Sequence, residues 1–354
     1  MRDFVYRGLP SRVVFGAGVR RQLRAEVERL GMRHVLVLTT PRQLEEAAEL
    51  GALLGDLCAG TFDGAALHTP VIVTEKALER MRQLEADGIV ALGGGSVIGL
   101  GKALALRTAA SQVAIPTTYA GSEMTPIVGQ TEGGRKTTLR DPQVLPETVI
   151  YDVELTVSLP PSISGTSGIN AVAHAVEALY APDTNPITSL LALEGIAALG
   201  RALPRVVQEG QNLEARGEAL YGAWLCATCL AHSSMGLHHK LCHTLGGALG
   251  LPHSETHTAV LPHAAAYNAP AAPEVMRGVA RALGAKNAPQ ALYDLGVSVG
   301  AKMALRDLGM PHGGLERALD LVFETPYPNP RPLERDGIRA LLERAWAGER
   351  PETP

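Results

Sequence analysis

The sequence predicts an N-terminal α/β domain with a Rossmann-like parallel sheet, followed by a C-terminal all-helical domain. Short β-rich apolar runs alternate with helical stretches in the first part of the chain, and long Ala- and Leu-rich segments follow. The 354 residues also exceed the roughly 100–200 residues of a single domain. We therefore expect two domains, 1–155 and 156–354.

Four buried strands are predicted in the first domain. Apolar runs rich in β-branched residues predict strands over 34–40, 88–96, 112–118 and 147–152, and the stretch 74–87 has the pattern of a helix. Strands separated by helices usually run parallel in one sheet. This arrangement is typical of nucleotide-binding folds.

Helical periodicity dominates after residue 152, as in "GINAVAHAVEALYA" (168–181) and "LEARGEALYGAWLCATCLAH" (213–232). Pro160 and Pro161 mark the expected boundary, because proline cannot continue a helix. The last residues, 347–354, are predicted to be disordered.

Composition excludes several classes of protein. The chain has 46% hydrophobic and 19% charged residues and a net charge of −4, without the basic footprint of a nucleic-acid binder. The residues at its start show no apolar stretch of signal-peptide length, and no segment is apolar over the ~18 residues that a membrane span needs. We expect a cytoplasmic protein with a small-molecule partner, in which Cys226 and Cys229 pack as buried core residues.

A glycine turn follows the strand predicted at 88–96. Gly93, Gly94, Gly95 and Ser96 come directly before a predicted helix, so backbone N–H groups and the positive end of that helix are open to a phosphate. The turn therefore predicts a pyrophosphate site, and the alternative is a tight turn that needs positive φ.

Further nucleotide contacts are expected after the neighbouring strands. Thr39 offers a hydroxyl, and Arg42 is either a partner for a 2′-phosphate or a solvated surface charge. Thr117, Thr118 and Ser122 follow another strand at the edge where open parallel sheets bind ligands. No acidic residue stands after the first strand to favour NADH, so NADH and NADPH both remain candidates.

Histidines recur at helical spacing in the second domain. In "GLHHKLCHTLGGALGLPH" (236–253), His239 and His243 are four residues apart and share a helix face, and His253 follows. Asn170 and His174 have the same spacing, with Glu177 one turn further. Spacing alone leaves metal binding, proton transfer and packing open.

These motifs together resemble the iron-containing, or group III, alcohol dehydrogenases, which fold similarly to dehydroquinate synthase. The resemblance covers nearly the whole chain, through "GGGS" with Lys102 behind it, "IPTTYAGSE", "DPQVLP", "ELTVSLP" and the two histidine motifs. It implies that Asn170, His174, His239 and His253 stand at the positions of the family's Fe²⁺ or Zn²⁺ ligands. It also implies that His243 lies near the nicotinamide and that the protein is a homodimer.

One departure from the family pattern decides the expected chemistry. Asn170 replaces the family's Asp ligand and removes the only negative charge of the set, so we expect no bound metal. With "YPNPRP" (327–332), the sequence is similar to one branch, the maleylacetate reductases, which are thought to work without metal. That branch reduces the C=C bond of maleylacetate to 3-oxoadipate in aromatic-compound degradation, and the range of chlorinated maleylacetates stays open.

A metal-free reduction is chemically reasonable for a conjugated ketone, because hydrogen-bond donors and imidazolium groups stabilise an enolate. We expect this role for five histidines, which are His243, His253, His239, His174 and His257. The dianionic substrate calls for cations and polar groups, for which the candidates are Asn170, Tyr119, Lys136, Arg140, Tyr327 and Arg331. Lys136 is also a candidate for binding the cofactor, and plain packing or a solvated charge is the alternative for each candidate.

Two other functions are weighed against this one. A metal-dependent alcohol or polyol dehydrogenase remains possible if His174, His239 and His253 hold zinc without the carboxylate. A catalytically inactive nucleotide-binding protein has no reason to keep polar groups in an apolar site.

Overall fold

The computed structural model describes residues 3–133 and 135–352, and the side chains of residues 135 and 136 lie outside this description. Contacts divide the chain into two compact units. Gly8–Leu159 form the α/β unit, and the chain from Pro160 onward forms the helical unit together with the segment that ends at Arg7. The sequence-based boundary at 155/156 lies slightly earlier and places that N-terminal segment in the first domain.

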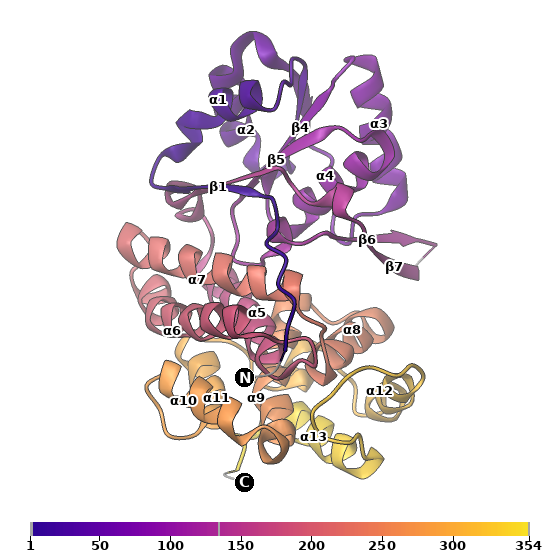
Figure 1. Ribbon diagram of the computed structural model, residues 1–354. Coiled ribbons are helices and arrows are strands. Elements are labelled where there is room, and N and C mark those ends of the chain that lie inside the picture. Colours follow the sequence, from indigo (N-terminus) through magenta and orange to yellow (C-terminus); the bar gives the residue numbers. More distant parts are fainter. Residues whose placement is uncertain (1–2, 134, 353–354) are drawn as a thin grey trace. The chain divides into compact units, whose positions relative to one another are not determined.

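The α/β unit is built on a parallel sheet with the order β1-β8-β5-β4-β2-β3 among the described residues (Figure 1). Its strands are β1 (Arg12–Gly16), β2 (Val35–Leu38), β3 (Cys58–Phe62), β4 (Gly88–Gly93), β5 (Ser111–Pro116) and β8 (Thr148–Asp152). The four predicted strands are confirmed as β2, β4, β5 and β8. The sequence analysis missed β1 and β3, the two edge strands.

Helices cover both faces of this sheet, because successive strand residues point to opposite sides. Val35 and Val37 of β2 pack into a core with α1 and α2, whereas Leu36 and Leu38 pack with α3 and α4. The helices are α1 (Leu23–Arg29), α2 (Leu44–Leu54), α3 (Val71–Gln83) and α4 (Gly95–Thr108). Because the central strands are buried on both faces, nearly all of their residues are apolar.

The strand order places a topological switch point between β2 and β4. The chain leaves β2 through α2 to β3 on one side, and leaves β4 through α4 to β5 on the other. Ligands of open α/β sheets bind outside the carboxyl ends of the strands at such a point. The glycine turn after β4 and Thr39 after β2 both lie there.

An antiparallel hairpin interrupts the α/β pattern before β8. It consists of β6 (Ile127–Glu132) and β7 (Arg135–Arg140) and was not predicted. The residues of β7 are mostly polar, so the apolar periodicity that identifies a buried strand is absent.

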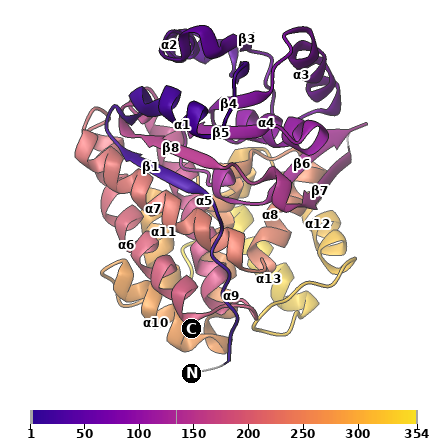
Figure 2. The same ribbon diagram turned by 45° about the horizontal axis from the view of Figure 1, so that its top comes forward.

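The helical unit packs around two buried helices, α5 and α9, as Figure 2 shows. Helix α5 contacts α6, α7 and α9, and helix α9 also contacts α8, α11 and α13. The helices are α5 (Pro161–Tyr180), α6 (Pro186–Gln208), α7 (Leu213–His232), α8 (Leu237–Leu249), α9 (His253–Asn268), α10 (Pro273–Ala282), α11 (Ala288–Ser298), α12 (Gly314–Phe323) and α13 (Arg335–Ala347). Pro161 is the first residue of α5, a position where the missing N–H of proline costs nothing.

Two smaller expectations have opposite outcomes. Cys226 and Cys229 are buried in α7, as predicted. The predicted disorder of the C-terminal tail is wrong for its described residues, because Arg350 pairs with Asp294 at 2.7 Å and Gln290 donates a hydrogen bond to the Pro351 carbonyl. None of the helices in the described chain has the length and apolar character to cross a membrane.

Candidate active site

The glycine turn is required sterically and leaves a helix N-terminus open. A Cβ on Gly93, whose φ is +151°, would lie 2.5 Å from the Val97 side chain, and one on Gly94 would lie 2.9 Å from Thr118. Gly95 begins α4, and no side chain caps that helix. The turn is therefore a tight turn that needs glycine, and its backbone N–H groups are also suited to an anion.

The carboxyl end of β2 lies next to this turn. The Gln43 amide donates a hydrogen bond to Thr117 Oγ1 at 3.2 Å, and the Thr117 backbone N–H donates to the Gly93 carbonyl at 3.2 Å. Thr39 is fully buried, and its hydroxyl has no hydrogen-bond partner among the described residues. Sequence reasoning missed Gln43, which connects the two sides of the switch point, whereas Arg42 beside it is exposed.

A buried lysine ties α4 to the loop that contains Ser122. The ammonium group of Lys102 donates to the carbonyls of Ser122, Thr125 (2.7 Å) and Ile127 (2.9 Å). Three carbonyls match the three N–H groups of an ammonium ion. Burial lowers the pKa of Lys102 to about 7, against the opposing charge of Glu123. Lys102 thus fixes the loop of the expected nucleotide contacts relative to the glycine turn.

The remaining predicted residues of this unit are Tyr119, Arg140 and Lys136. The Tyr119 side chain is fully buried, and Arg140 is exposed on β7. Lys136 lies on β7, and its side chain is outside the described part of the structure.

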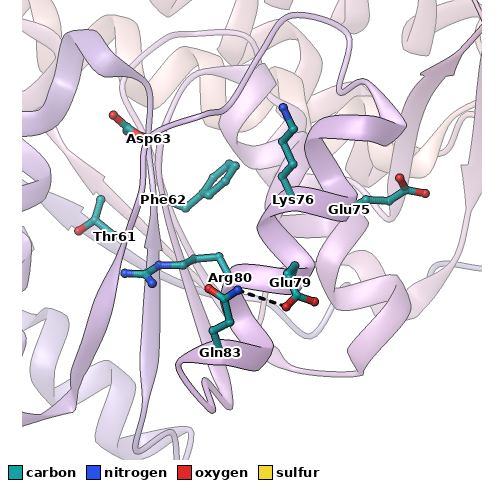
Figure 3. Close-up of a pocket in the computed structure, with 8 residues that line it drawn as sticks. All are labelled: Thr61, Phe62, Asp63, Glu75, Lys76, Glu79, Arg80 and Gln83. Carbon is teal, nitrogen blue, oxygen red and sulfur yellow. Dashed lines mark hydrogen bonds between the residues drawn. The ribbon is translucent and has the colours of Figure 1, made fainter.

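A separate surface pocket lies between β3 and α3 (Figure 3). It is lined by Thr61–Asp63 at the end of β3 and by α3 side chains from Glu75 to Gln83, of which Gln83 donates a hydrogen bond to Glu79. None of the residues predicted from sequence lines this pocket.

The helical unit brings six histidines together, which we call the histidine cluster: His174, His238, His239, His243, His253 and His257. His257 lies at its centre, with ring centroids 4.4 Å from His253, 4.8 Å from His238 and 4.9 Å from His239. All five predicted histidines belong to it. His238 was not predicted, because the prediction used residues four apart on one helix face and His238 is adjacent to His239, on a different face.

The cluster runs from the surface to the core. His243 and His253 are exposed, and their rings lie 6.4 Å apart in a stacked orientation. The other four rings are buried beneath them. The exposed pair is therefore accessible from solvent, and the buried rings lie beneath it.

Glu177 anchors one edge of the histidine cluster. Its carboxylate accepts hydrogen bonds from the backbone N–H groups of Gly236 (3.0 Å) and His238 (2.8 Å) at the start of α8, and from His239 Nδ1 (2.6 Å). The carboxylate compensates the positive end of α8 and holds the Nδ1–H form of His239. Nε2 of His239 is buried without a partner among the described residues.

Burial favours the neutral form of three of these rings. Burial lowers the pKa of His174, His238 and His257 well below the ordinary histidine value, and neighbouring histidines lower it further. These rings can donate one N–H each but do not carry a second proton. Among the five predicted histidines, His174 and His257 are therefore better suited to donate a hydrogen bond as neutral rings than to act as imidazolium acids.

The set at the family's metal positions fits a dication poorly. Asn170 Oδ1, His174 Nδ1 and His239 Nε2 are buried and have no hydrogen-bond partner in the described structure. The donors amount to imidazoles and one neutral amide oxygen, and the nearby carboxylate of Glu177 is occupied by N–H groups. Without an anionic oxygen, these residues suit Fe²⁺ or Zn²⁺ less well than a set that includes a carboxylate.

The "YPNPRP" loop braces the start of α8. The Pro328 carbonyl would lie 2.8 Å from a Cβ on Gly236, and Asn329 exchanges hydrogen bonds with Asn268. The Tyr327 hydroxyl is buried without a described partner, and burial raises its pKa.

The guanidinium group of Arg331 is already engaged. It lies 4.3 Å from the centre of the Tyr267 ring and donates to the Tyr267 carbonyl at 3.1 Å. It also lies 3.7 Å from the carboxylate of Glu334. The geometry therefore gives no support to Arg331 as the cation that binds the substrate.

Comparison with known proteins covers both units. The family model for iron-containing alcohol dehydrogenase matches residues 10–153, and the model for the C-terminal part of that family matches residues 164–346.

A maleylacetate reductase of Rhizobium sp. (strain MTP-10005) is 54% identical over 352 residues, which cover 99% of this chain and 100% of that protein. One of Burkholderia cepacia is 52% identical over 351 residues, with 99% and 100% covered. The crystal structure of maleylacetate reductase from Agrobacterium tumefaciens matches with a TM-score of 0.96 at 53% identity, covering 99% of this chain and 100% of that one. The chain belongs to the iron-containing alcohol dehydrogenase family.

Proposed function

We propose that the protein is a maleylacetate reductase, which uses NADH or NADPH to reduce the C=C bond of maleylacetate to 3-oxoadipate. The observation that carries this proposal is a convergent histidine cluster at the family's metal position, with Asn170 in place of a carboxylate ligand. The full-length relatives that bear this name support it.

The proposed reaction is a conjugate addition. The nicotinamide supplies a hydride when it is bound. The hydride adds to the alkene carbon remote from the ketone, the π electrons move to the ketone oxygen, and an enolate forms. A proton then adds to the carbon beside the ketone, so one hydride and one proton are consumed per C=C bond.

The helical unit would supply the donors for this step. His243 and His253 are exposed and would contact the substrate, one at the enolate oxygen and one at the carbon that is protonated. His239 is oriented by Glu177, while His174 and His257 offer N–H groups of neutral rings. Asn170 and Tyr327 are proposed to contact the dicarboxylate, and the cation for its charges would come from Arg140 or Lys136.

The α/β unit would hold the dinucleotide. The pyrophosphate is proposed to bind at Gly93, Gly94, Gly95 and Ser96, where α4 begins without a side-chain cap. The other proposed contacts are Thr39, Arg42, Thr117, Thr118 and Ser122. Arg42 is exposed beside the end of β2, so both NADH and NADPH are included in the proposal.

One assay tests the function directly. Protein freed of metal with a chelator and checked by elemental analysis is mixed with maleylacetate and either NADH or NADPH, and the nicotinamide absorbance is followed. Turnover without metal supports the proposal, and no turnover with either cofactor refutes it. His243→Ala should lower kcat, while Lys286→Ala, at an exposed position on α10's connection to α11, serves as the control.

The alternative is a metal-dependent alcohol or polyol dehydrogenase. It is favoured by the unpartnered Nε2 of His239, a nitrogen that presents a lone pair while Nδ1 is held by Glu177. Alcohol oxidation that depends on added Zn²⁺ or Fe²⁺, with no reduction of maleylacetate, would select it.

The proposal includes a homodimer and a cytoplasmic location, which the family resemblance and the composition imply. Light scattering on the purified protein tests the dimer, and a mass of one 37.3 kDa chain would contradict it.

A further inference from the structure

His238 and His257 form a hydrogen-bonded pair at the bottom of the histidine cluster. Nε2 of His238 lies 2.9 Å from Nδ1 of His257, and the two ring planes are inclined at 68° with centroids 4.8 Å apart. Both rings are completely buried. This contact joins α8 to α9 and reaches the central ring of the cluster from beneath.

The pair has two possible proton arrangements. A neutral imidazole carries one N–H, so one ring must donate and the other must accept. If His238 donates from Nε2, His257 carries its proton on Nε2; if His257 donates from Nδ1, His238 carries its proton on Nδ1. His238 Nδ1 and His257 Nε2 are both buried and without a partner among the described residues, so one of them bears an unused N–H.

We propose that His238 is a positioning residue, which donates to His257 and so holds the tautomer in which His257 presents Nε2–H to a substrate oxygen. This inference rests on the proposed function. His257 has four histidine rings of the cluster around it besides His238, including the exposed His253 at 4.4 Å, so its ring lies next to the exposed rings that would bind the substrate.

Without a substrate the two arrangements are equivalent, because each leaves one buried N–H, on His238 Nδ1 or on His257 Nε2, without a described acceptor. Of the two, the N–H on His257 is the one that a substrate oxygen would accept, since the His257 ring lies beside the exposed His253. Cys242 Sγ lies 3.7 Å from the same Nε2 of His238, but sulfur is a weak hydrogen-bond partner. His257 is therefore the strong partner of that nitrogen.

The test uses two variants of His238 and one control. His238→Phe keeps a ring but removes the hydrogen bond, and His238→Gln keeps an N–H donor near the position of Nε2. Cys242→Ala removes the other neighbour of Nε2 and leaves the histidine pair intact. For each folded variant, kcat and KM for maleylacetate are measured, and histidine-selective ¹⁵N NMR reports which ring nitrogen of His257 is protonated.

We expect His238→Phe to lower kcat by ~10- to 100-fold with KM changed less than about threefold, the range seen when a supporting hydrogen bond of a site residue is lost. His238→Gln should recover most of kcat, and Cys242→Ala should keep it. The ¹⁵N spectrum of the unmodified protein with maleylacetate should show His257 protonated at Nε2, and His238→Phe should lose this preference.

Three results would overturn the inference: an unchanged kcat in His238→Phe, no recovery in His238→Gln, or a wild-type spectrum with His257 protonated at Nδ1. If the variants do not fold, the spectrum of the wild-type protein still decides. If the wild-type protein does not reduce maleylacetate, the proposed function fails, while the spectrum of the free protein reports separately on the tautomer.

Discussion

Glu177→Gln should destabilise the helical unit strongly, since one carboxylate connects α5 to the start of α8. The carboxylate accepts from Gly236 N–H at 3.0 Å, His238 N–H at 2.8 Å and His239 Nδ1 at 2.6 Å. It is almost completely buried, so water cannot replace these bonds.

The magnitude follows from the number of acceptors. Glutamine keeps one carbonyl oxygen and turns an NH₂ group toward the remaining donors, so at least one N–H loses its partner and a second bond weakens. Hydrogen bonds to a charged group contribute about 1.5–3 kcal/mol each. The free energy of unfolding should therefore fall by about 3–5 kcal/mol, similar to the loss of one partner of a buried ion pair. For a unit of roughly 200 residues, this corresponds to a Tm lower by ~6–20 °C.

The measurement is thermal and urea unfolding followed by circular dichroism. Glu343→Gln makes the same chemical change at an exposed position on α13 and should leave the urea midpoint unchanged. If Glu177→Gln shifts the midpoint no more than this control, then the carboxylate does not anchor α8 and the reasoning is wrong. A second readout is kcat, which should fall because His239 loses the acceptor that orients its ring.

Three further predictions concern other residues. Gly94→Ala should destabilise the α/β unit by about 1–3 kcal/mol, because the new Cβ would lie 2.9 Å from Thr118. Gly95→Ala is the control and should not destabilise it, because the space around its Cβ is open. Thermal unfolding of the two variants measures the difference. Asn170→Asp should raise the affinity for Zn²⁺ by ~10-fold or more, since it supplies the missing anionic oxygen, as measured by competition with a chromogenic chelator. Lys102 has a pKa of about 7 in the folded protein and 10.5 in the unfolded chain, so between these values the unfolded chain binds the extra proton. The free energy of unfolding should therefore rise as the pH rises from 7 to 10, by at most ~1.4 kcal/mol per pH unit. Urea unfolding at several pH values measures this slope, which should be lost in Lys102→Met.

Each of these has a contradicting result. Equal melting temperatures for Gly94→Ala and Gly95→Ala would show that the turn relaxes around a Cβ. Unchanged zinc affinity in Asn170→Asp would mean that the donor set does not converge on one ion. Parallel pH profiles for wild type and Lys102→Met would assign the pH dependence to other groups.

The apolar pattern of the sequence predicted the buried strands and the glycine turn, because both depend on residues that are contiguous in the chain. The strands β2, β4, β5 and β8 are apolar on both faces, so their runs are visible without a structure. The edge strand β3 is half-buried with the sequence "CAGTF", and it carries no such signal. The glycine turn was found because strand, glycines and helix are contiguous in the chain.

The contacts that organise the site depend on residues far apart in sequence. Glu177 and His239 are 62 positions apart and meet only because α5 and α8 both pack against α9. His238 and His257 lie on consecutive helices, and their bond depends on the crossing of α8 and α9. Helical spacing identified which residues share a face, but it carries no information on which faces meet.

Two rings of the histidine cluster, His239 and His257, differ in what they would offer to a ligand. Glu177 holds the proton of His239 on Nδ1, so a neutral His239 presents a lone pair at Nε2, as a metal ligand or a proton acceptor must. A donor at His238 would hold the proton of His257 on Nε2, which then presents an N–H, as an oxyanion requires. A metal site needs a lone pair from each ring that binds the ion, and His257 is not at one of the family's ligand positions. Enolate chemistry needs both a donor and a ring that can gain and release a proton, and a protonated Nε2 of His257 beside His239 would provide this combination.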